Sequence, residues 1–166
     1  LGLRGGDLRA AERTFQLLMQ ATGRAGRAER PGRALLQTWT PEHPVLQALA
    51  AGDRDSFLAT ESEERRLAAL PPFGRLAALI LSGDKAEAVE KAAQLLAGAI
   101  PNAERLEVYG PADAPLALVR GRRRKRLLVR ADRDVDIQAF LRAWLARVKL
   151  PSSVRLSVDV DPYSFL

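Results

Sequence analysis

Apolar residues recur at regular spacings along this chain and predict an N-terminal, mainly helical part. Helical spacing near the start predicts an amphipathic helix that ends near Gln20, with four residues on its packed face: Leu8, Ala11, Phe15 and Leu18. A short apolar run at 34–38 is typical of a strand. Residues 44–70 are rich in alanine and charge and predict two short helices, the second at about 53–70. Thr40 is placed to cap the first of them, with Pro41 in its first turn.

The pair Pro71 and Pro72 marks a boundary, because proline cannot continue a helix. Beyond it the pattern predicts strands at 75–82, 106–109, near 115–119, 126–130 and 154–160, and helices at 84–100 and 134–149. The packed faces of the two helices are predicted to hold Ala86, Val89, Ala93 and Leu96, and Ile137, Leu141, Trp144 and Val148. We interpret this pattern as the split βαβ, ferredoxin-like arrangement of strand, helix, strand, strand, helix, strand, which has one strand fewer between its helices than the ranges above. Such a sheet buries one face under both helices and leaves the other free to bind a ligand.

The net charge and the scarcity of cysteine and histidine limit the functions that this chain can have. The 26 Lys and Arg residues against 20 acidic ones give a net charge of +6, which favours a polyanionic partner. With no cysteine, the chain has no disulfide, thiolate chemistry or cysteine-based zinc site, and its single histidine, His43, argues against a metal centre. His43 lies where it could cap a helix as readily as act. Asp159 and Asp161 share a strand face, where pairing with arginines is favoured over binding a cation.

A basic run between two predicted strands is the first candidate site. Its members are Arg120, Arg122, Arg123, Arg124, Lys125 and Arg126. A hairpin tip of this charge density repels itself, and a bound polyanion relieves the repulsion; the alternative is a merely solubilising loop. Positive charges contact phosphate and not bases, so we expect nucleic-acid binding without sequence preference. Paired aromatic residues for base stacking are missing, and Tyr109 is expected to be a half-buried sheet residue.

An arginine-glycine box at 20–27, reading QATGRAGR, is the second candidate site. Arginine stays charged and binds phosphate oxygens through two hydrogen bonds, and glycine lets backbone approach an anion closely. An isolated box of this kind is also compatible with a solvated basic loop.

The box and its flanks together resemble the second motor lobe of the primosomal replication-restart DNA helicases, the primosomal protein N′ (PriA) family. Five marks in order carry the resemblance: RAAERTFQLL at 9–18, the box, LQT-x-x-PEHPVLQ at 36–47, ERR-x-A-x-LPPF at 64–73 and DVDP at 159–162. A departure is Gly6-Asp7-Leu8-Arg9, where the family usually has Pro-Asp-Phe-Arg.

The resemblance implies an α+β (mixed α/β) chain in three parts: the end of the second RecA-like helicase lobe at 1–52, a helical connector at 53–72, and a ferredoxin-like βαββαβ DNA-binding domain at 73–166. It implies that Arg24 and Arg27 reach the γ-phosphate of ATP, with Gln20 and Gly23 beside the same phosphates. ATP and Mg²⁺ would act in the full-length protein only, because this chain has no phosphate-binding loop of its own. The family's zinc module lies in sequence absent here.

The resemblance further implies a bacterial, cytoplasmic, nucleoid-associated 3′–5′ helicase that binds forked and single-stranded DNA. Its partners would be single-stranded-DNA-binding protein and other primosome proteins, with no membrane. The chain begins with Leu1 and has no signal sequence, so we interpret it as the C-terminal piece of a longer polypeptide. Two rivals remain: an ATPase-deficient scaffold that binds fork DNA, and a generic basic nucleic-acid-binding module.

Overall fold

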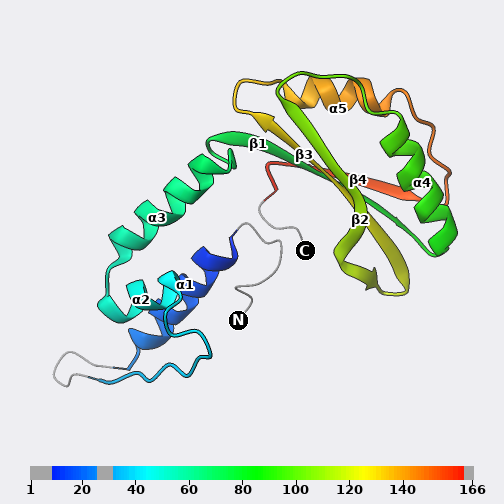
Figure 1. Ribbon diagram of the computed structural model, residues 1–166. Helices are drawn as coiled ribbons and strands as arrows, with labels where there is room; N and C mark the ends of the chain where they lie inside the picture. The colour runs from blue at the N-terminus through cyan, green and yellow to red at the C-terminus, as the bar shows by residue number, and fades with distance from the viewer. Residues whose placement is uncertain (1–8, 26–31, 163–166) are drawn as a thin grey trace. The chain divides into compact units, whose positions relative to one another are not determined.

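The structure, a computed structural model, describes residues 9–25 and 32–162. It divides into two compact units, Leu1–Glu64 and Arg65–Leu166, each of which is described by itself (Figure 1). The three-part division expected from the sequence stays a prediction.

Helices make up the regular structure described in the first unit. They are α1 (Ala10–Thr22), α2 (Pro44–Ala51) and α3 (Arg54–Leu67), the last of which runs across the division between the units. The rings of Phe15 and Phe57 stack 4.3 Å apart at 9° and form a small core with Val45. The predicted N-terminal helix and the two short helices that follow are therefore confirmed.

The start of α2 differs from the prediction. His43, and not Thr40, is the N-cap residue, and its Nδ1 accepts a hydrogen bond of 3.3 Å from the amide of Val45. Pro44 occupies the first turn, where its missing N–H leaves no donor unsatisfied and its fixed φ suits the helix. Of the two roles considered for His43, the structure therefore shows the cap.

The strand predicted at 34–38 is wrong. Residues 32–39 adopt no helix or strand, and the side chains of Leu35 and Trp39 are each 99% exposed. A strand forms only where its backbone groups find a ladder. The described part of the first unit contains no strand with which this segment could pair.

The second unit contains one four-stranded sheet and two helices that cover one of its faces. In chain order the elements are β1 (Gly74–Gly83), α4 (Ala86–Gly98), β2 (Leu106–Val119), β3 (Arg122–Asp132), α5 (Ile137–Leu145) and β4 (Arg155–Val160). The strands are ordered β2-β3-β1-β4, and each neighbouring pair is antiparallel. The predicted order of strands and helices is confirmed. The two short strands predicted at 106–109 and 115–119 are a single strand, β2, with two register shifts.

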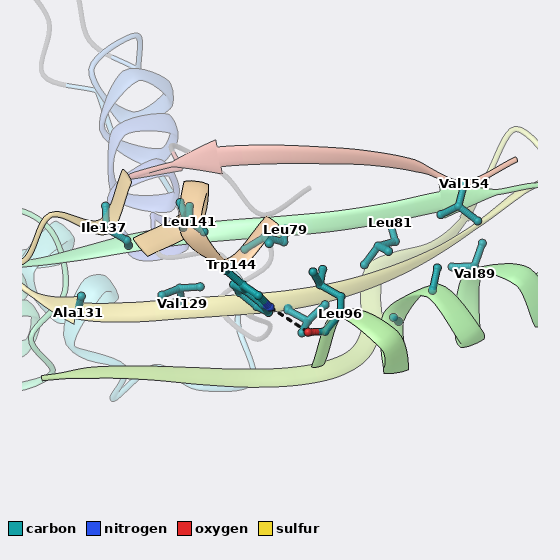
Figure 2. Packing of buried hydrophobic residues seen from close by; sticks show 14 residues of the cluster. Leu79, Leu81, Val89, Leu96, Val129, Ala131, Ile137, Leu141, Trp144 and Val154 are labelled. Carbon is teal, nitrogen blue, oxygen red and sulfur yellow. Dashed lines mark hydrogen bonds between the residues drawn. The ribbon is translucent and has the colours of Figure 1, made fainter. Parts of the chain in front are cut away.

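The core lies between the sheet and helices α4 and α5. Trp144 of α5 is fully buried and donates a hydrogen bond of 2.9 Å from Nε1 to the carbonyl of Leu96 on α4 (Figure 2). Val89 and Ala93 of α4 and Leu141 of α5 are buried around it, which confirms most of the predicted packed faces. The sheet face opposite this core, which carries neither α4 nor α5, is called the open face below.

Candidate nucleic-acid interface

The basic run belongs mostly to a strand and not to a hairpin tip. Only Arg120 and Gly121 form the turn between β2 and β3, with φ of 49° and 79°. Two-residue hairpin turns of the favoured type need positive φ at both positions, which glycine supplies without strain. The other five basic residues, at 122–126, are the first residues of β3. Those at 123–126 pair with β1, and Arg122 pairs with Val119 of β2. The expectation of a basic loop, with a strand only from 126, is corrected.

Strand geometry separates these basic residues onto two faces, because successive side chains of a strand alternate. Leu127 and Val129 are fully buried in the core. Arg123 and Lys125 are an even number of residues away from them along β3, so they lie on the same, helix-covered side. The members of the opposite phase lie on the open face: Arg122, Arg124, Arg126, Leu128 and Arg130. The predicted cluster is therefore divided, with three of its residues on the open face.

Lys125 is held inside the unit by two carboxylates. Its Nζ lies 2.9 Å from Oε2 of Glu90 on α4 and 3.1 Å from Oδ1 of Asp113 on β2. The hydrogen bond to Glu90, followed by that to Asp113, raises the pKa of Lys125. The hydrogen bond from Gln94, followed by that from Lys125, lowers the pKa of Glu90. The Lys125 charge is therefore balanced within the fold, and Lys125 is a weaker candidate for phosphate contact than its neighbours.

Arg122 and Arg124 on the open face make looser contacts than Lys125 does. Nε of Arg122 lies 3.6 Å from Oδ1 of Asp84, and Arg124 donates to the carbonyl of Leu116 over 3.5 Å. Arg126 is partly buried, and this burial lowers its pKa, although a guanidinium stays protonated in proteins. Arg122 and Arg124 are therefore held less closely by the fold than Lys125 is, and they are better candidates for contact with an external anion.

Arg155 belongs with this group, and the sequence did not single it out. Ser82 of β1 pairs with Arg124 of β3 on one side and with Arg155 of β4 on the other. Because residues that are directly opposite in a sheet project to the same side, Arg155 is on the open face. The alternation of the last strand indicates that Arg155 points away from the core. Only the strand register reveals that it lies on the same face as the basic run, across Ser82 of β1 from Arg124.

A second polar group on the open face lies farther along the hairpin. The Tyr109 hydroxyl donates a short hydrogen bond to Oε2 of Glu107, which also accepts one of 2.8 Å from Arg130. The Arg130 guanidinium lies over the Tyr109 ring, with Cζ 5.7 Å from the ring centroid. Tyr109 lies in β2 and is 45% exposed, in agreement with the half-buried sheet residue expected.

The arginine-glycine box lies at the C-terminal end of α1. Gln20 is exposed in the last turns of the helix, Gly23 is the C-cap residue, and Arg24 is exposed in the turn that follows. Arg27 lies outside the described residues. Gln20, Gly23 and Arg24 are thus adjacent at one helix end, while their contact with a nucleotide stays a prediction.

The described residues contain no group of three metal-ligating side chains close enough to hold an ion. Within the same residues, every helix is too short or too polar to cross a bilayer. The geometry thus defines a class of protein: an α+β domain whose antiparallel sheet is covered by two helices on one face and carries arginines on the other.

Comparison with known proteins identifies the family. A family model described as "Primosomal protein N C-terminal domain" matches residues 66–163, and the chain belongs to this family. The family resemblance drawn from the sequence motifs is confirmed.

Relatives named "Replication restart protein PriA" align with nearly the whole chain. The Rickettsia felis protein is 41% identical over 165 residues, which cover 99% of this chain and 25% of that protein. The Synechocystis protein is 40% identical over 162 residues, which cover 95% of this chain and 19% of the relative. The Bacillus subtilis protein is 34% identical over 167 residues, with shares of 96% and 20%. The chain therefore spans a quarter or less of the length of these relatives.

Proposed function

We propose that this chain is the C-terminal part of a replication-restart DNA helicase and that its open sheet face binds the DNA backbone. The observation that carries this proposal is the placement of Arg122, Arg124 and Arg155 on one face of the sheet. The names of the relatives and the matched family model support the assignment to replication restart.

The arrangement suits phosphate and not base edges. Alternate residues of a strand are about 6.6 Å apart, so the β3 arginines form a row of cations that can follow a flexible polyanion. Guanidinium groups bind phosphate oxygens through paired hydrogen bonds. Such contacts provide affinity without sequence information, which a protein that acts at any stalled fork requires.

Two charge-matched variants of the whole chain test this proposal. One is Arg122→Ala/Arg124→Ala/Arg155→Ala. The other removes three exposed arginines on and beside α5, Arg133→Ala/Arg142→Ala/Arg147→Ala. Fluorescence anisotropy with labelled single-stranded and forked DNA is expected to show a loss of about tenfold or more for the open-face variant and a much smaller loss for the control. Equal losses would mean that net charge and not this face governs binding. Circular dichroism melts show whether both variants fold.

We further propose that the box acts in ATP hydrolysis by the longer protein, with Arg24 and Arg27 contacting the γ-phosphate and Gln20 and Gly23 beside it. ATP and Mg²⁺ would be bound mainly by parts of the protein outside this chain, as would the zinc of the family. The position of the box at the end of a helix anchored by Phe15 supports a fixed geometry. Arginines of this type contribute about 10³ to 10⁵ to the rate of phosphoryl transfer.

DNA-dependent ATP hydrolysis by the longer protein tests the role of the box. We expect Arg27→Ala to abolish most of it and Arg33→Ala, an exposed arginine outside the box, to leave it near wild type. If the wild-type protein binds forks without hydrolysing ATP, the scaffold alternative holds instead. The same protein would meet single-stranded-DNA-binding protein and other primosome proteins in the bacterial cytoplasm, at the nucleoid.

A further inference from the structure

Tyr109 is the one aromatic residue in the four described strands. Its cross-strand partner is Leu128, a member of the open-face phase of β3, so the Tyr109 ring also lies on the open face. At 45% exposure the ring is accessible to a ligand. Proteins that bind single-stranded nucleic acids combine exposed aromatic residues with positively charged ones on one surface.

The ring is fixed in place before any ligand arrives. Glu107 accepts hydrogen bonds from the Tyr109 hydroxyl and from Arg130, and the Arg130 guanidinium lies over the ring. The bond from Tyr109, followed by the charge of Arg130, lowers the pKa of Glu107, and the bond to Glu107 raises the pKa of Tyr109. A ring held by its hydroxyl loses little conformational entropy when a base stacks on it.

The backbone brings the ring next to the phosphate-binding row. Beyond Tyr109 the ladder shifts register, and Ala112 is the residue that pairs with Arg126. Gly110, with φ of +103°, lies between them, and a Cβ there would be 2.7 Å from the Arg126 carbonyl oxygen. The backbones of β2 and β3 therefore lie close together at this point. The Tyr109 ring and the Arg126 side chain are diagonal neighbours on one face of the sheet. A strand whose phosphates follow the β3 arginines would therefore present a base to the ring.

We infer that Tyr109 stacks on a base of single-stranded DNA and so makes the open face prefer single strands to duplex. This inference rests on the proposed function, because the arginines must first hold the backbone. In a duplex both faces of each internal base are covered by its neighbours, whereas an unpaired strand can turn a base onto an aromatic side chain. The competing interpretation is that Tyr109 only joins β2 to β3 through Glu107 and Arg130.

An abasic strand separates these interpretations. The probes are a labelled thymine oligonucleotide of about 15 nucleotides, an abasic oligonucleotide of equal length and charge, and a duplex. Wild type is compared with Tyr109→Ala and with Tyr109→Phe, which keeps the ring and loses the bond to Glu107. For Tyr109→Ala we expect about 5- to 150-fold weaker binding to the thymine strand, with affinity for the abasic strand and the duplex unchanged. Tyr109→Phe is expected to bind the thymine strand less tightly than wild type, because its ring is no longer held, but more tightly than Tyr109→Ala, and to bind the abasic strand and the duplex as wild type does.

A Tyr109→Ala variant that binds the thymine and abasic strands with equally reduced affinity would overturn the inference in favour of a structural role. Unchanged binding of the thymine strand would overturn it as well. In both cases wild type still binds the abasic strand and the Arg122/Arg124/Arg155 variant still loses that binding, so the proposed function stands. If wild type binds neither strand, the proposed function itself fails.

Discussion

Arg124 of β3 and Arg155 of β4 flank the same residue of β1, Ser82, from opposite sides. Antiparallel pairing therefore projects both guanidinium groups from one face of the sheet, although the two arginines are distant in sequence. The two arginines are two strand spacings apart, about 9.5 Å between backbones, and like charges at that distance on one face repel each other in the absence of an anion. A bound phosphate backbone relieves that repulsion, which is why this pair is central to the DNA-binding proposal.

The Trp144 indole is predicted to be the most sensitive side chain of the second unit. Trp144→Phe removes the donor to the buried Leu96 carbonyl and is expected to cost about 1–3 kcal/mol of unfolding free energy. Trp144→Ala adds a cavity and is expected to cost about 3–5 kcal/mol. The control is Leu95→Ala, at a half-exposed position of α4 next to Leu96. We expect it to change the free energy of unfolding by no more than about 0.5 kcal/mol. Urea denaturation measures all three; a Trp144→Ala cost no larger than that of the control would contradict the core described above.

Two glycines give opposite predictions for the same substitution. A Cβ at Gly74 would lie 2.0 Å from the backbone oxygen of Ala69, so Gly74→Ala forces backbone movement at the start of β1. We expect it to lower the free energy of unfolding by about 1–3 kcal/mol or more. A Cβ at Gly98, the last residue of α4, meets nothing within 4 Å. Gly98→Ala is therefore expected to stabilise by about 0.4–1 kcal/mol. Thermal melts of the two variants check both signs, and stabilisation by Gly74→Ala would count against the turn geometry.

Acid stability is predicted to depend on the Lys125 pair with Glu90. The folded pKa of Glu90 lies below its ordinary value of 4.5, so this group contributes stability above that pH and loses it as the pH falls through the folded pKa. The folded pKa of Lys125 lies above 10.5, so its contribution is complete below that pH and is lost only at higher pH. Both contributions are present at neutral pH.

Lys125→Met is therefore expected to lower the melting temperature at neutral pH and to flatten its decline on the acid side of about pH 4.5. The matched control is Lys91→Met. It removes a lysine that forms an exposed ion pair with Glu87, and both residues lie on α4, the helix that carries Glu90. Exposed pairs contribute little, so the control should shift the melting temperature less. Parallel pH profiles for wild type and Lys125→Met would contradict the coupling.

The sequence predicts helices and strands well where apolar residues recur at one regular spacing. The 3.6-residue spacing of Val89, Ala93 and Leu96 is a local property that tertiary contacts reinforce. The short apolar run at 34–38 predicted a strand and formed none, because a strand depends on a partner that local sequence does not specify. At the start of α2, two prolines offered alternative first turns, and the later one is used.

The candidate site was harder to predict, because register is a long-range property. A run of five basic residues has no apolar alternation, so the start of β3 resembles a loop until its pairing with β1 is known. The same pairing separates Lys125 from Arg124 and brings Arg155 beside the row. Strand alternation places Glu107 and Tyr109 on one face, but nothing in the sequence near Tyr109 indicates that Arg130 of β3 lies over its ring.

The salt dependence of binding shows whether the open face, and not net charge alone, binds the DNA backbone. Anisotropy titrations with single-stranded DNA between about 50 and 200 mM salt give the slope of log affinity against log salt. For three or four neutralised phosphates we expect a slope of about −2 to −3 for wild type and for Arg133→Ala/Arg142→Ala/Arg147→Ala. For Arg122→Ala/Arg124→Ala/Arg155→Ala we expect a slope that is shallower by about 2. Equal slopes for the two variants would contradict the claim and place the DNA elsewhere on the chain.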